Sequence, residues 1–268
     1  MAGAVLCVLL SDASTAASAP EAARPLTPDL SGYWGDFAPV RLPPGMVIGK
    51  LAPGTKIGSN IRASGGAAAP PSAESTLPAG LNYTPEALAR QQKLAQDNDY
   101  DPAYDNGACM PLGIIRQTLG SAGGVGGGPI QIVQQANLVA ILYESPPVFR
   151  VIPLDGRVHD PDSDPSYMGD SVGHWEGDTL VVDVRNFNDV TWLKDNGLHH
   201  SEQMHIVERW RRVGDTLQWQ ATVTDPLVLT APWVVSRVFN RAPGKMIIGE
   251  DPCVDRNAKY FNGAEGYH

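Results

Sequence analysis

HWEGDTLVV (residues 174–182) and RWRRVGDTLQW (residues 209–219) are the two stretches that decide the fold class. Each contains a tryptophan, then a turn with Gly-Asp, then Thr-Leu at the start of a new alternating run. Glycine in such a turn supplies a positive φ, and aspartate can hydrogen-bond to its own backbone. The repeated unit therefore predicts two similar antiparallel hairpins in one sheet.

Alternation of polar and apolar residues continues along the chain from residue 130. Gly32-Tyr33-Trp34, in the first expected strand, resembles the opening signature of calycin barrels such as lipocalins. We therefore expect a mostly β protein, an antiparallel calycin/lipocalin-like β-barrel that can hold one small ligand. The pattern predicts strands at about 130–135, 138–144, 148–154, 171–175, 179–187, 204–213, 216–224 and 233–240.

The N-terminal hundred residues have a different composition. Residues 1–19 hold a short apolar run followed by small residues, which is typical of a secretory signal peptide. Residues 20–100 are rich in Pro, Gly, Ala and Ser and predict an irregular arm with the first strand and one short helix. Thr84 is the expected N-cap of that helix. We expect the barrel domain to occupy 101–268 and the protein to be periplasmic or secreted.

Composition also limits the cofactors and partners. If the signal peptide is cleaved, Cys109 and Cys253 remain, either as one disulfide or as two buried thiols. A net charge of −9 without a long basic run argues against nucleic-acid and membrane partners. Phosphate-loop, dinucleotide-binding and nucleophile-elbow motifs are missing, so we expect no cofactor. A small-molecule partner is expected, and a homodimer is left open.

HHSEQMHIVERW, residues 199–210, holds three of the six histidines. In a strand, Glu208 would share a face with Met204, Ile206 and Trp210. A carboxylate on an apolar face must be paired, or its pKa rises until it is neutral. Glu208 is thus predicted to be half of a buried ion pair or an acid–base residue. Its candidate partners are Arg150, Arg185 and Arg237.

The histidines of this stretch do not have the spacing of a metal site. His200 and His205 are five residues apart, which places them on opposite faces of a strand. His199 and His205 could share a face but would lie about 20 Å apart along an extended chain. We therefore expect no metal. Acid–base work by one histidine is the functional alternative, and an ordinary hydrogen-bonded loop histidine is the structural one.

A second polar cluster lies between residues 149 and 178. Much of it is turn chemistry, with Asp-Gly and Asp-Pro pairs. His159 and Tyr167 are candidates for function because turns do not require them, and loops at a barrel mouth often carry function. Tyr143 ends an apolar strand, where its hydroxyl can reach the barrel interior.

The blocks GDSVGHWEGDTLVV (169–182) and HHSEQMHIVERW (199–210) resemble those of a group of exported bacterial proteins, many of them from sphingomonads and acidobacteria. The resemblance implies a lipocalin-like barrel. The habitats of the group suggest catabolism of plant-derived aromatic compounds, by association only. Residues of this chain inside the shared motifs are His159, Asp170, Trp175, Glu176, His200, His205, Glu208 and Arg209.

We expect a cofactor-independent periplasmic lyase that acts by acid–base catalysis on a small hydroxylated, plant-derived and aromatic compound. His200 is the expected base, Tyr143 or His159 the acid, and Glu208 the residue that orients a partner. Arg150 would hold a developing oxyanion. One alternative is a non-catalytic barrel that binds a small hydrophobic ligand, and another is a structural domain without a ligand. The predicted substrate-binding residues are Arg150, Trp175, His205, Trp210, Tyr167 and Asp170.

Overall fold

The computed structural model describes residues 27–36, 56–57, 77–96, 110–120, 126–144, 147–244 and 246–249. The expected signal peptide, Cys109 and Cys253 lie outside these ranges, so the export and disulfide predictions stay predictions. None of the helices in the described part of the chain is long and apolar enough to cross a membrane.

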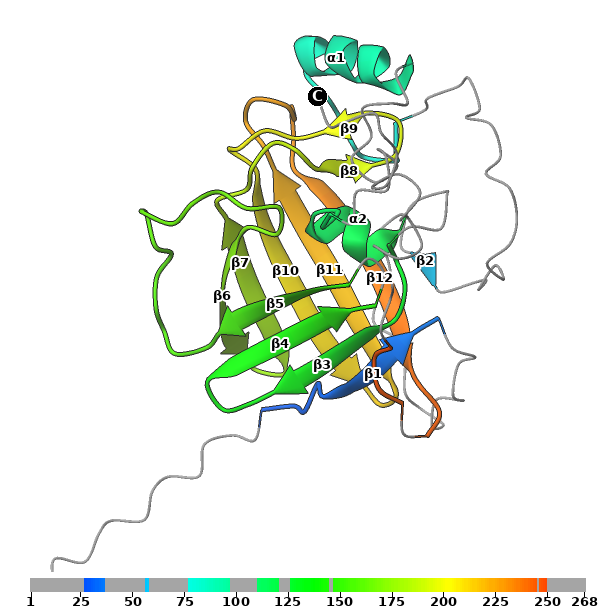
Figure 1. Ribbon diagram of the computed structural model, residues 1–268, viewed down its shortest axis with the longest axis vertical. Helices are drawn as coiled ribbons and strands as arrows, with labels where there is room; N and C mark the ends of the chain where they lie inside the picture. Colours follow the sequence, from blue (N-terminus) through cyan, green and yellow to red (C-terminus); the bar gives the residue numbers. More distant parts are fainter. Residues whose placement is uncertain are drawn as a thin grey trace, which may run out of the picture.

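Nine antiparallel strands form a nearly closed barrel (Figure 1). Each strand lies beside its neighbour along the chain, and the first strand, β1, pairs with the last, β12. This up-and-down order is that of lipocalin barrels, so the fold-class prediction is confirmed. The strands are β1 (Gly32–Gly35), β3 (Ile130–Gln134), β4 (Leu138–Tyr143), β5 (Val148–Pro153), β6 (Asp170–Glu176), β7 (Thr179–Arg185), β10 (His205–Val213), β11 (Thr216–Thr224) and β12 (Trp233–Arg241).

The repeated Gly-Asp units form the turns that the sequence predicts. Gly177 and Gly214 have φ values of 61° and 59°. Each begins a two-residue loop between paired strands, β6–β7 and β10–β11. The pairing places Trp210 opposite Trp219. The two hairpins lie side by side because β7 also pairs with β10.

One seam of the barrel, between β5 and β6, has no ladder of backbone hydrogen bonds in the described sheet. The two strands nevertheless pack closely at Gly173 of β6. A Cβ atom at this position would lie 2.7 Å from Ile152 Cγ2 and 2.8 Å from Leu154 Cδ2. Glycine at position 173 therefore leaves the space that the side chains of Ile152 and Leu154 need to pack against β6.

A cap lies over one end of the barrel (Figure 1). It contains α1 (Pro85–Gln96), α2 (Ile114–Leu119) and the pair of β8 (Trp192–Lys194) with β9 (Leu198–His199). The backbone N–H of Ala87 donates to Thr84 Oγ1 at 3.2 Å, which confirms the predicted N-cap. Four short elements are not predicted from the sequence: α2, β8, β9 and β2 (Lys56–Ile57), which pairs in parallel with β12. These elements are too short to show a hydrophobic period.

Candidate functional site

The structure divides the ten predicted site residues among several places. The barrel interior holds Tyr143, Arg150, Glu208 and Trp210, all of them buried. Its outer wall holds His159, Asp170 and His205, and the cap holds His200. Trp175 and Tyr167 are partly buried against the hydrophobic core.

Glu208 forms a buried ion pair with Arg150, which selects one of the three partners that the sequence left open. Arg150 Nη2 donates to Glu208 Oε2, and the Trp219 indole donates to Glu208 Oε1 at 2.8 Å. Glu208 is fully buried and Arg150 is 5% exposed. Both carboxylate oxygens therefore already have a donor. The other two candidates pair elsewhere, Arg237 with Asp36 and Arg185 with Asp183.

Several buried polar atoms of the barrel interior and of α2 have no hydrogen-bond partner among the described residues. They are the Tyr143 hydroxyl, Arg150 Nε and Nη1, Trp210 Nε1 and Thr118 Oγ1. Arg150 and Thr118 lie near the Tyr143 hydroxyl, but neither bonds to it with acceptable geometry. We call Thr118, Tyr143, Arg150, Glu208, Trp210 and Trp219 the interior cluster.

The strand registers explain why the interior cluster comes together. Tyr143 and Arg150 come from β4 and β5, and their side chains alternate with exposed or half-exposed neighbours. Glu208 and Trp210 share the inner face of β10. Thr118 belongs to α2, and its backbone carbonyl accepts a hydrogen bond from Arg237 Nη1. The cluster thus joins the barrel wall to the cap.

Burial sets the protonation states of the interior cluster. Burial raises the pKa of the Tyr143 hydroxyl, and the nearby Arg150 charge opposes the rise only in part. Burial alone would lower the pKa of Arg150, but the charge and hydrogen bond of Glu208, together with smaller contributions from Tyr143, outweigh burial and raise the pKa. At neutral pH the cluster therefore holds a protonated tyrosine and a charged guanidinium.

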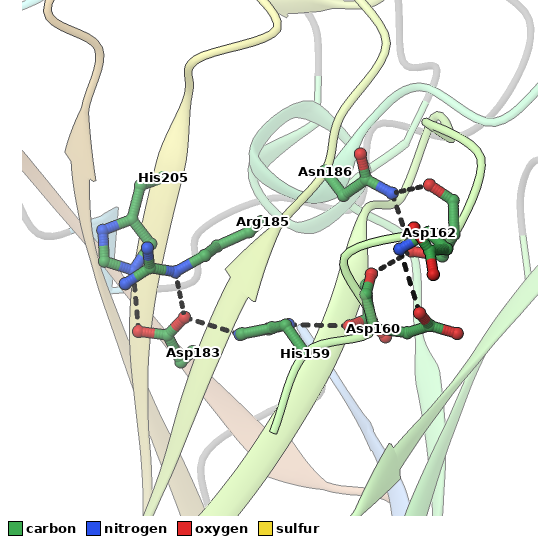
Figure 2. A network of polar contacts seen from close by, with 9 residues as sticks. His159, Asp160, Asp162, Asp183, Arg185, Asn186 and His205 are labelled. Atoms are coloured by element: carbon green, nitrogen blue, oxygen red, sulfur yellow. Dashed lines mark hydrogen bonds and ion pairs between the residues drawn. The ribbon is translucent and has the colours of Figure 1, made fainter. Parts of the chain in front are cut away.

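A second polar network lies on the outer wall of the barrel, over β6, β7 and β10 (Figure 2). His159, Arg185 and His205 all point toward the carboxylate of Asp183. His159 Nε2 lies 2.7 Å from Oδ1, His205 Nε2 lies 2.7 Å from Oδ2, and Arg185 Nε lies 2.9 Å from Oδ1. His159 Nδ1 in addition lies 2.7 Å from Asp170 Oδ2. We call these five residues the outer network.

The outer network fastens the long β5–β6 connection to the barrel wall. His159 belongs to that connection, whereas Asp170 and Asp183 belong to β6 and β7. Both His159 nitrogens can donate to carboxylates only when the ring is cationic. Burial raises the pKa of Asp183, but hydrogen bonds from Arg185, His205 and His159 outweigh it and lower the pKa to about 2.

The cap histidine His200 has both ring nitrogens in use. Nδ1 lies 3.0 Å from the Ser201 carbonyl, so it is the N–H donor, and Nε2 then accepts from the Thr191 hydroxyl at 2.8 Å. Burial lowers the pKa of His200. A neutral, fully bonded ring has no lone pair left for a substrate, so the geometry does not support His200 as the general base.

The two sequence neighbours of His200 also have structural partners. Burial lowers the pKa of His199, whose carbonyl accepts from Tyr83 at 2.6 Å. The Ser201 hydroxyl donates to Asp225 Oδ1 at 2.8 Å, and the Ser201 backbone N–H donates to Asp225 Oδ2 at 2.7 Å. Within the described ranges, no group of three or more His, Cys, Asp or Glu side chains could hold a metal ion.

Three residues of these two sites, Asp183, Thr118 and Trp219, are not predicted from the sequence. Asp183 is the one acidic residue in the apolar run LVVDV, and this isolated charge could have drawn attention to it, although alternation places it on the face opposite to Leu180, Val182 and Val184. Trp219 alternates with polar residues in the run TLQWQATVT and carries no local sign of a polar role. Thr118 lies on a helix that the sequence did not predict.

No protein-family model matches the chain, and no curated protein matches it either. Among solved structures, a mutant of the fluorescent protein UnaG is similar at 16% sequence identity and a TM-score of 0.29. The match covers 50% of this chain and 90% of that chain. A likeness this slight carries no argument about fold or function, and the barrel is established by its own strand pairing.

Proposed function

We propose that the barrel binds a small hydroxylated, aromatic molecule at the interior cluster. The observation that carries this proposal is the group of unpartnered hydrogen-bonding atoms on Tyr143, Arg150, Trp210 and Thr118 in the described interior. A buried donor without an acceptor costs about 1–3 kcal/mol. Acceptor oxygens of a bound molecule would recover this free energy.

A purely structural role explains the interior cluster less well. Well-packed apolar residues of similar volume are often as stabilising as a buried ion pair, or more so. A barrel selected for stability alone has little use for Arg150 and Glu208 at its centre. Perturbed titratable groups in such a place are instead typical of functional sites.

Acid–base catalysis without a cofactor, in a periplasmic lyase, is the second candidate function. It is favoured by the position of the Tyr143 hydroxyl beside the Arg150 guanidinium. Because burial raises its pKa, Tyr143 keeps its proton at neutral pH and would act as a proton donor. Arg150, held by Glu208, would stabilise a developing oxyanion. Tyr143 would thus fill the acid role that the sequence assigned to Tyr143 or His159, and this candidate function does not use His200 as the base.

One experiment separates the two candidates. The protein is incubated with a panel of lignin-type dimers, phenolic diols and phenolic acids, and mass spectrometry follows both bound compounds and products. Retained but unchanged compounds would support binding alone, and a product that Tyr143→Phe no longer forms would support catalysis. Tyr83→Phe is the matched control, because it removes a hydroxyl that bonds to the cap. If no compound is retained or changed, the proposal fails.

A further inference from the structure

We infer that the polar end of the ligand is an anionic oxygen group, in the simplest case an aromatic carboxylate, held by Tyr143, Arg150 and Trp210. This inference rests on the proposed function, because it names the class of molecule that the interior cluster takes. It is carried by the hydrogen-bonding character of the unpartnered atoms and by the balance of buried charge.

All five unpartnered atoms of the interior cluster can donate a hydrogen bond, and three of them can only donate. Arg150 Nε and Nη1 and Trp210 Nε1 can only donate. The hydroxyls of Tyr143 and Thr118 can donate or accept. The acceptor oxygens of Glu208 are already used by Arg150 and Trp219. A matching ligand must therefore supply oxygen acceptors rather than further donors.

The charge balance favours an anion over a neutral acceptor. Arg237 lies on β12 opposite Trp219, and its guanidinium lies 4.4 Å from the centre of the Phe239 ring. Arg150 and Arg237 are both 5% exposed and Glu208 is fully buried, so this part of the interior holds two buried cations and one buried anion. Asp36 forms an ion pair with Arg237, but its side chain is 27% exposed and therefore better solvated than that of Glu208. Hydrogen bonds from donors to a charged oxygen are about twice as strong as those to a neutral one.

The aromatic side chains of the interior would give the ring of such a ligand a flat surface to pack against. Trp210 stacks on Phe239 with ring centres 6.2 Å apart and planes 20° apart. The Trp219 ring is tilted by 51° to Trp210 at 6.1 Å. Because Trp210 combines this stacked ring with an unpartnered N–H, it can contact both the apolar and the polar part of one ligand.

The test measures binding of matched acids, esters and alcohols at pH 7 by calorimetry. Benzoate, para-hydroxybenzoate and ferulate are each compared with the methyl ester and the primary alcohol of the same ring system. We expect each acid to bind at least about tenfold more tightly than its ester, since hydrogen bonds to a charged group contribute more than those to a neutral one.

Variants then locate the binding site. Tyr143→Phe and Trp210→Phe should each weaken binding of the acids by about tenfold or more and change ester binding much less. Tyr83→Phe, which removes a hydroxyl from the cap, should leave both affinities unchanged. Circular dichroism of each variant confirms that the barrel is folded.

The outcomes separate the inference from the function it rests on. Esters or alcohols that bind as tightly as the acids, with equal sensitivity to Tyr143→Phe, would overturn the carboxylate inference and leave interior binding intact. Acids whose affinity is insensitive to both interior variants would show that the anion binds elsewhere. Failure of every acid, ester and alcohol to bind would overturn both.

Discussion

Separating Glu208 from Arg150 should destabilise the barrel more than removing both charges together. The pair is buried in the barrel interior, and the Trp219 indole also donates to Glu208. Removing one partner of a buried ion pair typically costs about 3–5 kcal/mol, because the remaining charge has lost its counter-charge. We expect costs in this range for Glu208→Gln and for Arg150→Met.

The double variant Arg150→Met/Glu208→Gln should cost much less than the sum of the single variants. Methionine fills space without a charge, and glutamine keeps an oxygen acceptor for Trp219. Replacement of a whole buried pair by groups of similar volume is often nearly neutral. We therefore expect a coupling energy of at least about 2 kcal/mol, which is typical of residues in direct contact.

Urea unfolding at pH 7 measures this coupling. Far-ultraviolet circular dichroism is the preferred signal, because Trp219 fluorescence responds to its own contact with Glu208. The exposed pair Arg157–Asp155 is the control, and its removal should leave the unfolding midpoint unchanged. Single-variant costs that add to within about 0.5 kcal/mol would show that the two charges do not depend on each other.

Three further predictions concern the outer network, the cap and the seam. Asp183→Asn should expose the β5–β6 connection to proteolysis and lower the free energy of unfolding by about 1 kcal/mol, a value reduced for the partial exposure of Asp183. The unmodified protein should lose the same free energy as the pH falls from about 4 toward about 2, because the pKa of Asp183 is lowered in the folded state. Unchanged cleavage of the variant would contradict the anchoring role. Burial keeps His200 neutral in the folded state, whereas the unfolded chain binds a proton at this residue below about pH 6.5. The free energy of unfolding should therefore fall as the pH drops below about 6.5, by up to about 1.4 kcal/mol per pH unit. Urea titrations at several pH values should show a flatter slope for His200→Asn. Gly173→Val should cost about 1–3 kcal/mol by overpacking the seam, whereas Gly128→Ala meets no atom within 4 Å; equal unfolding midpoints for the two would refute the seam argument.

The barrel could be predicted because its signals are local. Alternation within each run locates the strands to within two residues at each end, and Gly177 and Gly214 have the positive φ values that the Gly-Asp turns require. Neighbouring strands joined by such turns must pair, so most of the sheet order follows from chain order. The apolar face around Glu208 likewise predicted either a buried cation beside the carboxylate or an acid–base role for it.

The identity of that cation was decided only by the tertiary structure. Arg150 lies 58 residues before Glu208 and reaches it across the barrel, so no local pattern links the two. The same holds for Thr118, which enters the interior cluster from a six-residue helix.

The fate of the histidines also depended on tertiary contacts. His200 bonds to the Thr191 hydroxyl in the cap. His205 and His159 both bond to Asp183 on the outer wall. Side-chain alternation fixes which face a residue occupies, because it depends only on the backbone of its own strand. Which charged group lies across from it depends on the closure of the barrel and the placement of the cap, and these are set by packing between segments far apart in the chain.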